Sequence, residues 1–115
     1  MKTIEIKNRF TGSVIFSHTE ENNTIKETLE KAIKEKVDLL GCDLSGSDLS
    51  NSDFSGSDLR YSDFSNSNLS NSDFSYSNLR DSNFSGCDLR GCDLSNCDLR
   101  GCENNDKAYL TFLNK

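Results

Sequence analysis

The feature that most constrains the fold of this chain is a leucine or phenylalanine at every fifth position. The stretch SDFSGSDLRYSDFSNSNLS, residues 52–70, contains almost no other apolar side chain. An α-helix repeats its buried face about every 3.6 residues and a flat strand every two, so neither returns the fifth residue to the interior. Thirteen such units follow one another without insertion from Val37 to Gly101. The fold must therefore bury one large side chain per five residues.

Each unit contains a small residue, then Asp or Asn, then Leu or Phe, and then two polar residues, as in CDLSG at residues 42–46. This unit closely resembles the repeat of the pentapeptide repeat family, and the resemblance covers residues 37–101. It implies an all-β solenoid, a right-handed quadrilateral parallel β-helix with one pentapeptide on each side and twenty residues in each coil. At that repeat length the chain would form about three coils.

The residue types within a unit are consistent with a square coil. Around the central Leu49, the neighbours Asp48 and Ser50 point outward if the strand alternates, and Ser47 points back inward. The fifth residue turns the corner, and it is usually Gly or Asn, which tolerate a left-handed backbone. The family commonly has Ala at the inward small position, whereas this chain mostly has Ser. We expect these buried hydroxyls to bond to backbone carbonyls or to one another between coils.

Sorting the central residues by position modulo twenty gives four columns, one for each side of the coil. The centres are Leu39, Leu59, Leu79 and Leu99 on the first side, Leu44, Phe64 and Phe84 on the second, Leu49, Leu69 and Leu89 on the third, and Phe54, Phe74 and Leu94 on the fourth. The four phenylalanines fall on two opposite sides. This predicts that aromatic rings stack above aromatic rings from coil to coil.

The segment that precedes the repeats, residues 1–36, has different periodicities. Two β-rich runs, TIEIKN and SVIFS, predict a hairpin. Thr24 and Glu27 form a capping box, and apolar residues follow at i, i+4, i+7 and i+8 from Ile25. A helix is therefore expected over about residues 24–36. We expect the hairpin and helix to cap the first coil, because an open end would invite strand pairing between molecules.

The segment after the repeats, residues 103–115, regains apolar side chains from Tyr109 onward. We expect it to cap the last coil of a β-helix that spans residues 37–102. A homodimer through the C-terminal end is the other way to cover that coil.

Composition alone would favour disorder, because the chain is 33% hydrophobic and has a net charge of −6. The strict period argues against disorder, since it places the few apolar side chains on one side of the backbone. There is no run of about 18 apolar residues that would predict a membrane span. The start, MKTIEIKNRF, lacks the apolar core of a secretory signal. Five cysteines cannot all pair within one chain, so reduced thiols in a cytoplasmic protein are expected.

Four of the cysteines, Cys87, Cys92, Cys97 and Cys102, fall on four successive sides of one coil at the inward position. Four thiolates could in principle hold zinc. The centre of that coil is filled by leucines, however, and the C-x₄-C spacing does not match a zinc knuckle. Cysteine is also an ordinary small core residue. We interpret these four and Cys42 as packing residues and expect neither a metal nor another cofactor.

Catalytic motifs are not recognisable. The only histidine, His18, falls in the predicted connection between hairpin and helix, and the many Ser and Asp residues arise from the repeat itself. No Ser–His–Asp arrangement can be singled out, and the glycines precede no helix that would make a phosphate loop. We therefore expect that the chain is not an enzyme.

The charge distribution is more informative. Residues 37–102 contain eleven Asp but only four Arg, and this acidic balance argues against direct nucleic-acid binding, which needs a basic surface. The predicted coil places an acidic column on the fourth side, an arginine column beside aspartates on the first side, and two exposed tyrosines at corners. These candidate interaction residues are Asp53, Asp73, Asp93, Arg60, Arg80, Arg100, Tyr61 and Tyr76.

We interpret the chain as a structural or protein-interaction module with an unknown protein partner. The resemblance also implies an alternative, because some pentapeptide repeat proteins protect DNA gyrase and look like a DNA duplex in shape and charge. Carboxylates at regular spacing would then meet a basic groove of a type II topoisomerase. A third interpretation takes serine columns such as Ser45, Ser65 and Ser85 as an ice-binding lattice, although such surfaces usually use threonine.

Overall fold

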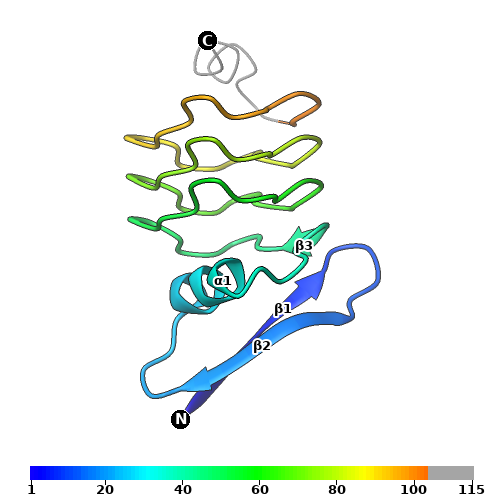
Figure 1. Ribbon diagram of the computed structural model, residues 1–115, viewed down its shortest axis with the longest axis vertical. Coiled ribbons are helices and arrows are strands. Elements are labelled where there is room, and N and C mark those ends of the chain that lie inside the picture. The colour runs from blue at the N-terminus through cyan, green and yellow to red at the C-terminus, as the bar shows by residue number, and fades with distance from the viewer. Residues whose placement is uncertain (104–115) are drawn as a thin grey trace.

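The computed structural model describes residues 1–103 of the 115-residue chain, so the predicted C-terminal cap lies almost entirely outside the described residues. The elements are β1 (Lys2–Asn8), β2 (Val14–Glu20), α1 (Ile25–Lys34) and β3 (Cys42–Asp43). The three strands form an antiparallel sheet in the order β2-β1-β3. The hairpin and α1 lie at one end of a stack of coils formed by the repeats (Figure 1).

The N-terminal elements agree with the sequence prediction in type and nearly in extent. The Oγ1 atom of Thr24 accepts the backbone N–H of Glu27 at 3.1 Å, as the capping box predicts. Helix α1 ends at Lys34 rather than near residue 36, because the backbone is left-handed at Lys36, with φ of 61°. Residue 36 therefore begins the turn into the repeats instead of extending the helix.

The predicted position of His18 in a connecting loop is wrong. His18 lies within β2 and pairs with Ile4 of β1, and the strand continues to Glu20, which pairs with Lys2. The second strand is longer than the apolar run SVIFS because the whole length of β1 offers it backbone partners. The Nε2 atom of His18 lies 2.9 Å from a carboxylate oxygen of Glu20.

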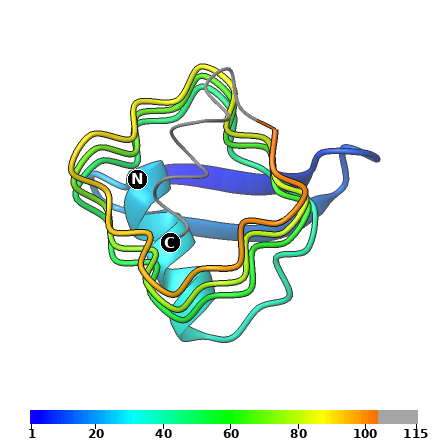
Figure 2. The ribbon, with the colours of Figure 1, turned by 90° about the horizontal axis from the view of Figure 1, so that it is seen from above.

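The repeats form coils of twenty residues. Parallel bridges join residues twenty apart, from Asp43 with Asp63 up to Asn83 with Glu103. The Leu44 N–H donates to the Asp63 carbonyl at 2.8 Å, and the Asp63 N–H donates to the Cys42 carbonyl at 2.9 Å. Viewed along the stack, the coils superimpose on a four-cornered outline (Figure 2). The period of twenty is therefore confirmed.

The fifth residue of every unit adopts a left-handed backbone, from Gly41 to Gly101. Gly and Asn suit this conformation, but Tyr61 and Tyr76 also adopt it, with φ of 63° and 62°. A left-handed backbone is strained for a bulky side chain. The coil geometry therefore overrides the local preference of these two tyrosines.

The central leucines and phenylalanines fill one continuous core, and none of them is more than 7% exposed. The rings of Phe64 and Phe84 stack at 5.1 Å between centroids, and those of Phe54 and Phe74 lie at 5.2 Å in a tilted arrangement. The predicted columns of rings are confirmed. Phe64 and Phe74 also meet edge to face at 5.7 Å, a contact between opposite sides that the columns did not predict.

The inward serines bridge successive coils, as predicted. The Ser67 hydroxyl donates to the Leu44 carbonyl at 2.7 Å and accepts the Ser47 N–H at 3.1 Å. The same pair of bonds recurs at Ser72, Ser77 and Ser82. Within residues 1–103, no buried side-chain nitrogen or oxygen lacks a hydrogen-bond partner. Hydroxyls in the core thus join the coils instead of weakening them.

The first predicted unit, residues 37–41, completes only part of a coil side. Leu39 is buried and the Gly41 N–H donates to the Arg60 carbonyl at 3.0 Å. In the described part of the chain, however, no bridge joins Asp38 to Asp58 as Asp43 joins Asp63. The regular ladder therefore begins at about Gly41, and residues before it diverge from the coil above.

Helix α1 covers part of the first coil through a side chain. The Glu30 carboxylate accepts the Asp53 N–H at 3.0 Å. In the next coil, the equivalent Asp73 N–H donates to the carbonyl of Ser52. Glu30 thus replaces the carbonyl that a preceding coil would supply.

Candidate interaction surfaces

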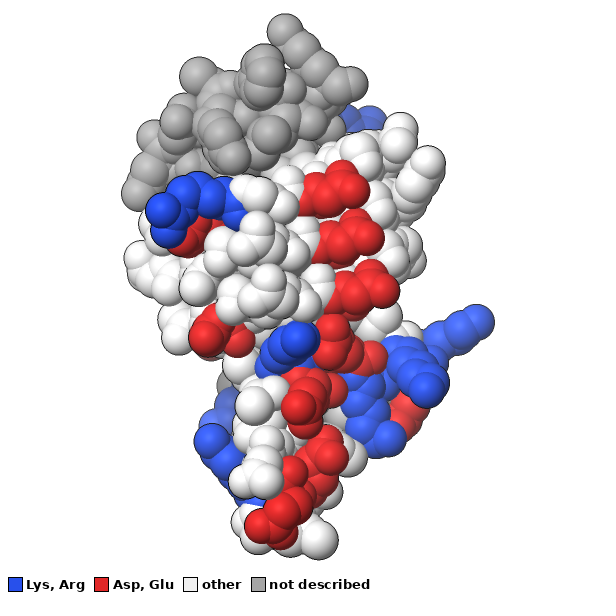
Figure 3. Space-filling view, turned by 90° about the vertical axis from the view of Figure 1, so that its left-hand side faces the viewer, with Lys and Arg blue, Asp and Glu red and all other residues white. Residues whose placement is uncertain are grey.

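The fourth side carries a straight row of carboxylates. Parallel bridges connect Asp53 with Asp73 and Asp73 with Asp93, so the three residues lie directly above one another. Acidic side chains form a vertical row on the face shown in Figure 3. Each of the three carboxylates accepts the backbone N–H of the serine two residues later, at 2.8 to 3.1 Å. The same local hydrogen bond therefore orients all three carboxylates.

Local hydrogen bonds favour the charged form of two carboxyls of this row. The Ser55 hydroxyl donates to Asp53 and the Ser95 hydroxyl donates to Asp93, at 2.7 and 2.6 Å. These hydroxyl bonds lower the pKa of both carboxyls from the usual aspartate value. The ion pairs found among residues 1–103 involve none of the three aspartates. The row thus offers carboxylates that no arginine or lysine neutralises.

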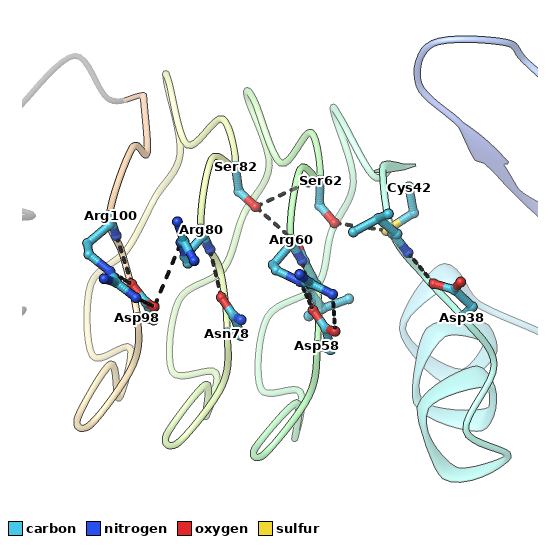
Figure 4. Close-up of polar contacts among 12 residues, drawn as sticks. Asp38, Cys42, Asp58, Arg60, Ser62, Asn78, Arg80, Ser82, Asp98 and Arg100 are labelled. Atoms are coloured by element: carbon cyan, nitrogen blue, oxygen red, sulfur yellow. Dashed lines mark hydrogen bonds and ion pairs between the residues drawn. The ribbon is translucent and has the colours of Figure 1, made fainter.

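The first side, in contrast, contains paired charges (Figure 4). Arg60 donates two hydrogen bonds to Asp58, at 2.8 and 2.9 Å, and Arg100 contacts Asp98 in the same way. In the coil between them, Asn78 stands at the position of these aspartates. Arg80 therefore has no aspartate in its own unit, and its Nε atom lies 3.9 Å from the Asp98 carboxylate of the next coil. The predicted arginine column is therefore a column of ion pairs.

The two candidate tyrosines lie at the two corners that bound the first side. Tyr76 is 72% exposed and Tyr61 is 43% exposed. The Tyr61 backbone carbonyl accepts a hydrogen bond from the Arg9 guanidinium at 3.1 Å. This contact joins the hairpin to the coil. It could not be predicted from the sequence, because Arg9 lies in the hairpin and Tyr61 in the repeat, and no common periodicity relates them.

The four C-terminal cysteines lie in the core positions that serine occupies in the coils below. The thiols of Cys87, Cys97 and Cys102 donate to backbone carbonyls of the preceding coil, where serine hydroxyls donate elsewhere. Burial raises the pKa of these three thiols to about 11 and that of Cys92 to about 12. Protonated, hydrogen-bonded thiols are poor metal ligands, since a thiolate is the ligand form.

Where cysteine replaces serine, the backbone N–H in the coil below has a different hydrogen-bond acceptor. The Ser47 N–H donates to the hydroxyl of Ser67, whereas the Ser67 N–H, which lies below Cys87, donates to the carbonyl of Phe64 at 3.1 Å. The weakness of sulfur as an acceptor fits this change of partner. The Cys42 N–H makes the same kind of bond, to the Leu39 carbonyl at 3.2 Å, although Ser62 lies above it. In the described part of the chain, no three His, Cys, Asp or Glu side chains converge as metal ligands.

Residues 1–103 include no helix that is long and apolar enough to cross a membrane.

Comparison with known proteins places the repeats in a wider context. A family model described as a pentapeptide repeat region matches residues 28–104. No curated protein sequence matches the chain.

Several solved structures resemble the chain in part. One is the pentapeptide repeat protein Rfr23 from the cyanobacterium Cyanothece 51142, with 29% identity and a TM-score of 0.39 over 55% of this chain and 50% of that one. Another is QnrB1, a plasmid-mediated fluoroquinolone resistance protein, with 16% identity and a TM-score of 0.31 over 62% of this chain and 39% of that one. A third is alr5209 from Nostoc Pcc 7120, with 19% identity and a TM-score of 0.33 over 62% and 73% of the two chains. The chain spans about half the length of Rfr23.

Proposed function

Because this chain belongs to the pentapeptide repeat family, we propose that it is a non-enzymatic protein-interaction module that binds a partner protein through the acidic row on its fourth side. The scaffold is a right-handed quadrilateral β-helix of about three coils. The observation that supports this function is the contrast between two sides of one coil. Asp58 and Asp98 on the first side are paired with arginines, whereas Asp53, Asp73 and Asp93 are held in line without a cation.

The row favours a partner with a basic surface. Its carboxylates repeat at the spacing of stacked strands, about 4.8 Å. Closely spaced charges of one sign attract an opposite surface and raise the rate of association. The core hydroxyls and thiols, for their part, are bound in hydrogen bonds that join the coils, which fits a structural role for them rather than a chemical one.

The test is affinity capture from a bacterial lysate with the full chain and with the triple variant Asp53→Asn, Asp73→Asn and Asp93→Asn. Asparagine already occupies the equivalent position at Asn68, where it accepts the Ser70 N–H at 3.0 Å, so the variant preserves the turn. Proteins captured through the row should be lost from the variant. A matched control, Asp43→Asn, Asp48→Asn and Asp63→Asn, removes the same charge from other sides and should retain them. Capture that is the same for all three proteins would contradict this function.

The second candidate function is an acidic mimic of DNA that binds a type II topoisomerase such as DNA gyrase. The regular vertical spacing of carboxylates favours it, since a duplex also presents anions at fixed intervals. The purified chain should then inhibit gyrase supercoiling or reduce quinolone-induced cleavage, and the triple variant should not. Gyrase activity that is unchanged by an excess of the chain would eliminate this candidate.

Two further properties complete the proposal. We place the protein in the cytoplasm, because its five free cysteines fit a reducing compartment. We also propose a homodimer through the C-terminal end, which would lengthen the row; the contact involves residues outside the described range. Sedimentation of the full chain as a monomer at micromolar concentration would rule out that dimer. Direct binding to nucleic acid is not part of this proposal, given the acidic surface.

A further inference from the structure

An open groove of about 690 Å³ separates the end of α1 and the segment after it from the first side of the next coil. One wall contains Ile33, Lys34, Lys36, Val37, Asp38 and Leu39, and the other contains Ser57, Asp58 and Arg60. A smaller hollow of about 290 Å³ also involves Ile33, Lys34 and Ser55, so the two spaces adjoin. The groove exists because residues 37–39 diverge from the coil above them.

The coil wall of this groove presents a short backbone edge. On the second side, the N–H and the C=O of Asp63 bond to Cys42 and Leu44 in the coil below. Asp58 is the equivalent residue on the first side, and no backbone group among residues 1–103 bonds to its N–H or its C=O. By the same geometry both groups face residues 37–39. The edge can therefore pair with one residue of an extended chain.

The other wall supplies apolar surface and positive charge. Ile33 and Val37 are half-buried against the core, and Lys34 and Lys36 are exposed. The ion pairs within the described residues include neither lysine, whereas the Asp58 carboxylate is already paired with Arg60. Lys34, Lys36 and Arg60 line the groove together with the carboxylates of Asp38 and Asp58, while Glu30 and Asp53 line the adjoining hollow beside Lys34. The groove lining thus has one more positive than negative side chain, on a chain whose net charge is −6.

We propose that this groove binds a short extended segment of a partner protein in which an apolar residue lies next to an Asp or a Glu. The segment pairs with the Asp58 backbone as an added strand, a common mode of peptide recognition. Its apolar side chain packs on Ile33 and Val37, and its carboxylate approaches Lys34 and Lys36. This proposal rests on the interaction function stated above and adds a second site with a defined class of ligand.

The test uses random peptides displayed on phage and selected against the immobilised full-length triple variant Asp53→Asn, Asp73→Asn and Asp93→Asn, so that the acidic row does not capture basic peptides. A selected peptide is then synthesised with a fluorophore, and its Kd is measured by fluorescence anisotropy. We expect selected peptides to combine an acidic residue with a neighbouring apolar one. The double variant Lys34→Glu and Lys36→Glu should bind about tenfold more weakly or worse, because attraction becomes repulsion. Methylation of the peptide nitrogen that pairs with Asp58 should also weaken binding.

A matched control reverses the same charge elsewhere. Lys2→Glu with Lys26→Glu changes two lysines that do not line the groove, and its Kd should stay within about twofold. Lys34→Glu places an anion in the last turn of α1 and Lys26→Glu places one in its first turn, so the two double variants should differ from the unaltered chain by only about 1 kcal/mol in stability. Thermal melting checks that both are folded at the temperature of the binding assay. Selected peptides without acidic residues, or equal binding to both double variants, would overturn the proposal.

The result is separable from that of the acidic row. The variant that neutralises Asp53, Asp73 and Asp93 should bind the groove peptide at least as tightly as the unaltered chain, since it removes a carboxylate beside Lys34 and no positive charge. If the row fails to capture a partner but the peptide binding is lost with the lysines, only the function assigned to the row is wrong. If the row captures a partner but peptide binding does not depend on the lysines, only the proposal for the groove is wrong.

Discussion

The rings of Phe64 and Phe84 lie with their planes 8° apart and their centroids 5.1 Å apart, although twenty residues separate them in the chain. Their alignment results from the coil, which returns to the same side after four units. The stack on the opposite side meets this one where Phe74 contacts Phe64. The two aromatic columns therefore form one connected cluster across the core.

Phe64 and Phe74 should be the two phenylalanines whose loss costs most, because each of their rings contacts two other rings. We expect Phe74→Ala to reduce the free energy of unfolding by about 3–5 kcal/mol. The conservative change Phe84→Leu should cost less than about 1.5 kcal/mol, since leucine is the usual centre elsewhere. Urea unfolding monitored by circular dichroism measures both. A smaller effect for Phe74→Ala than for Phe84→Leu would contradict the connected cluster.

The serine bridges predict the cost of removing one hydroxyl. Ser67→Ala leaves the Leu44 carbonyl and the Ser47 N–H without their buried partner, so stability should fall by about 1–3 kcal/mol. Ser67→Cys should cost less, because the cysteines of the last coil donate to the equivalent carbonyl. Thermal unfolding of the three proteins compares them. Equal stability of Ser67→Ala and the unaltered chain would show that these bonds contribute nothing.

The corner at Tyr76 predicts a stabilising substitution. Asn96 occupies the same corner in the next coil with φ of 58°, and asparagine tolerates this backbone better than tyrosine does. Tyr76→Asn should therefore raise the free energy of unfolding by about 1 kcal/mol. The reverse change, Asn96→Tyr, should lower it by a similar amount. Chemical denaturation tests the pair, and a loss of stability in Tyr76→Asn would contradict the strain.

The Asp98 carboxyl predicts part of the acid sensitivity. Its hydrogen bonds with Arg100 lower its pKa to about 2, and Arg80 adds a smaller electrostatic effect. Because the unfolded chain binds this proton more readily, the stabilising contribution is complete above about pH 4 and is lost as the pH falls toward 2. Carbon-13 NMR titration should show that Arg100→Gln raises this pKa more than Arg80→Gln does. An unchanged titration in Arg100→Gln would contradict the assignment.

The buried thiols predict slow alkylation and alkaline sensitivity. Burial raises the pKa of Cys97 to about 11, so its thiolate at pH 8 is scarcer than in the unfolded chain by on the order of 100-fold. Iodoacetamide should modify it slowly in the native protein and rapidly in urea, as measured by mass spectrometry. The pH dependence of stability is opposite to that for Asp98. The buried, protonated thiol stabilises the folded chain below about pH 8.5, and this stabilisation is lost as the pH rises toward 11. Fast native labelling would contradict burial.

Much of the repeat region was predictable because its contacts recur at a fixed interval. The spacing of Leu49 from Leu69 and of Ser47 from Ser67 shows both the buried centre and the hydrogen-bonded partner in the next coil. The left-handed corners followed from the Gly and Asn residues, although Tyr76 could be placed there only by its position in the repeat. The acidic row followed from the same columns.

The contacts of the N-terminal segment were not predictable in this way. Arg9 bonds to the Tyr61 carbonyl, and Glu30 bonds to the Asp53 N–H, yet neither partner shares a period with the other. The groove beside Asp58 arises where an apolar helix pattern gives way to the repeat, and residues 37–39 satisfy the sequence pattern without completing a coil side. These contacts depend on how the N-terminal hairpin and helix pack against the first coil. The sequence pattern of the helix or of the repeats alone does not specify that packing.

The pairing of residues twenty apart also governs which changes in chain length this architecture tolerates. Duplication of twenty residues would add one complete coil and keep every column aligned, so the acidic row would gain one more position. Duplication of five would preserve each local turn yet rotate everything above it by a quarter of a circuit, and Asp93 would no longer stand over Asp73. A protein of this architecture can therefore lengthen and keep a continuous charged face only if residues are added in whole coils of twenty.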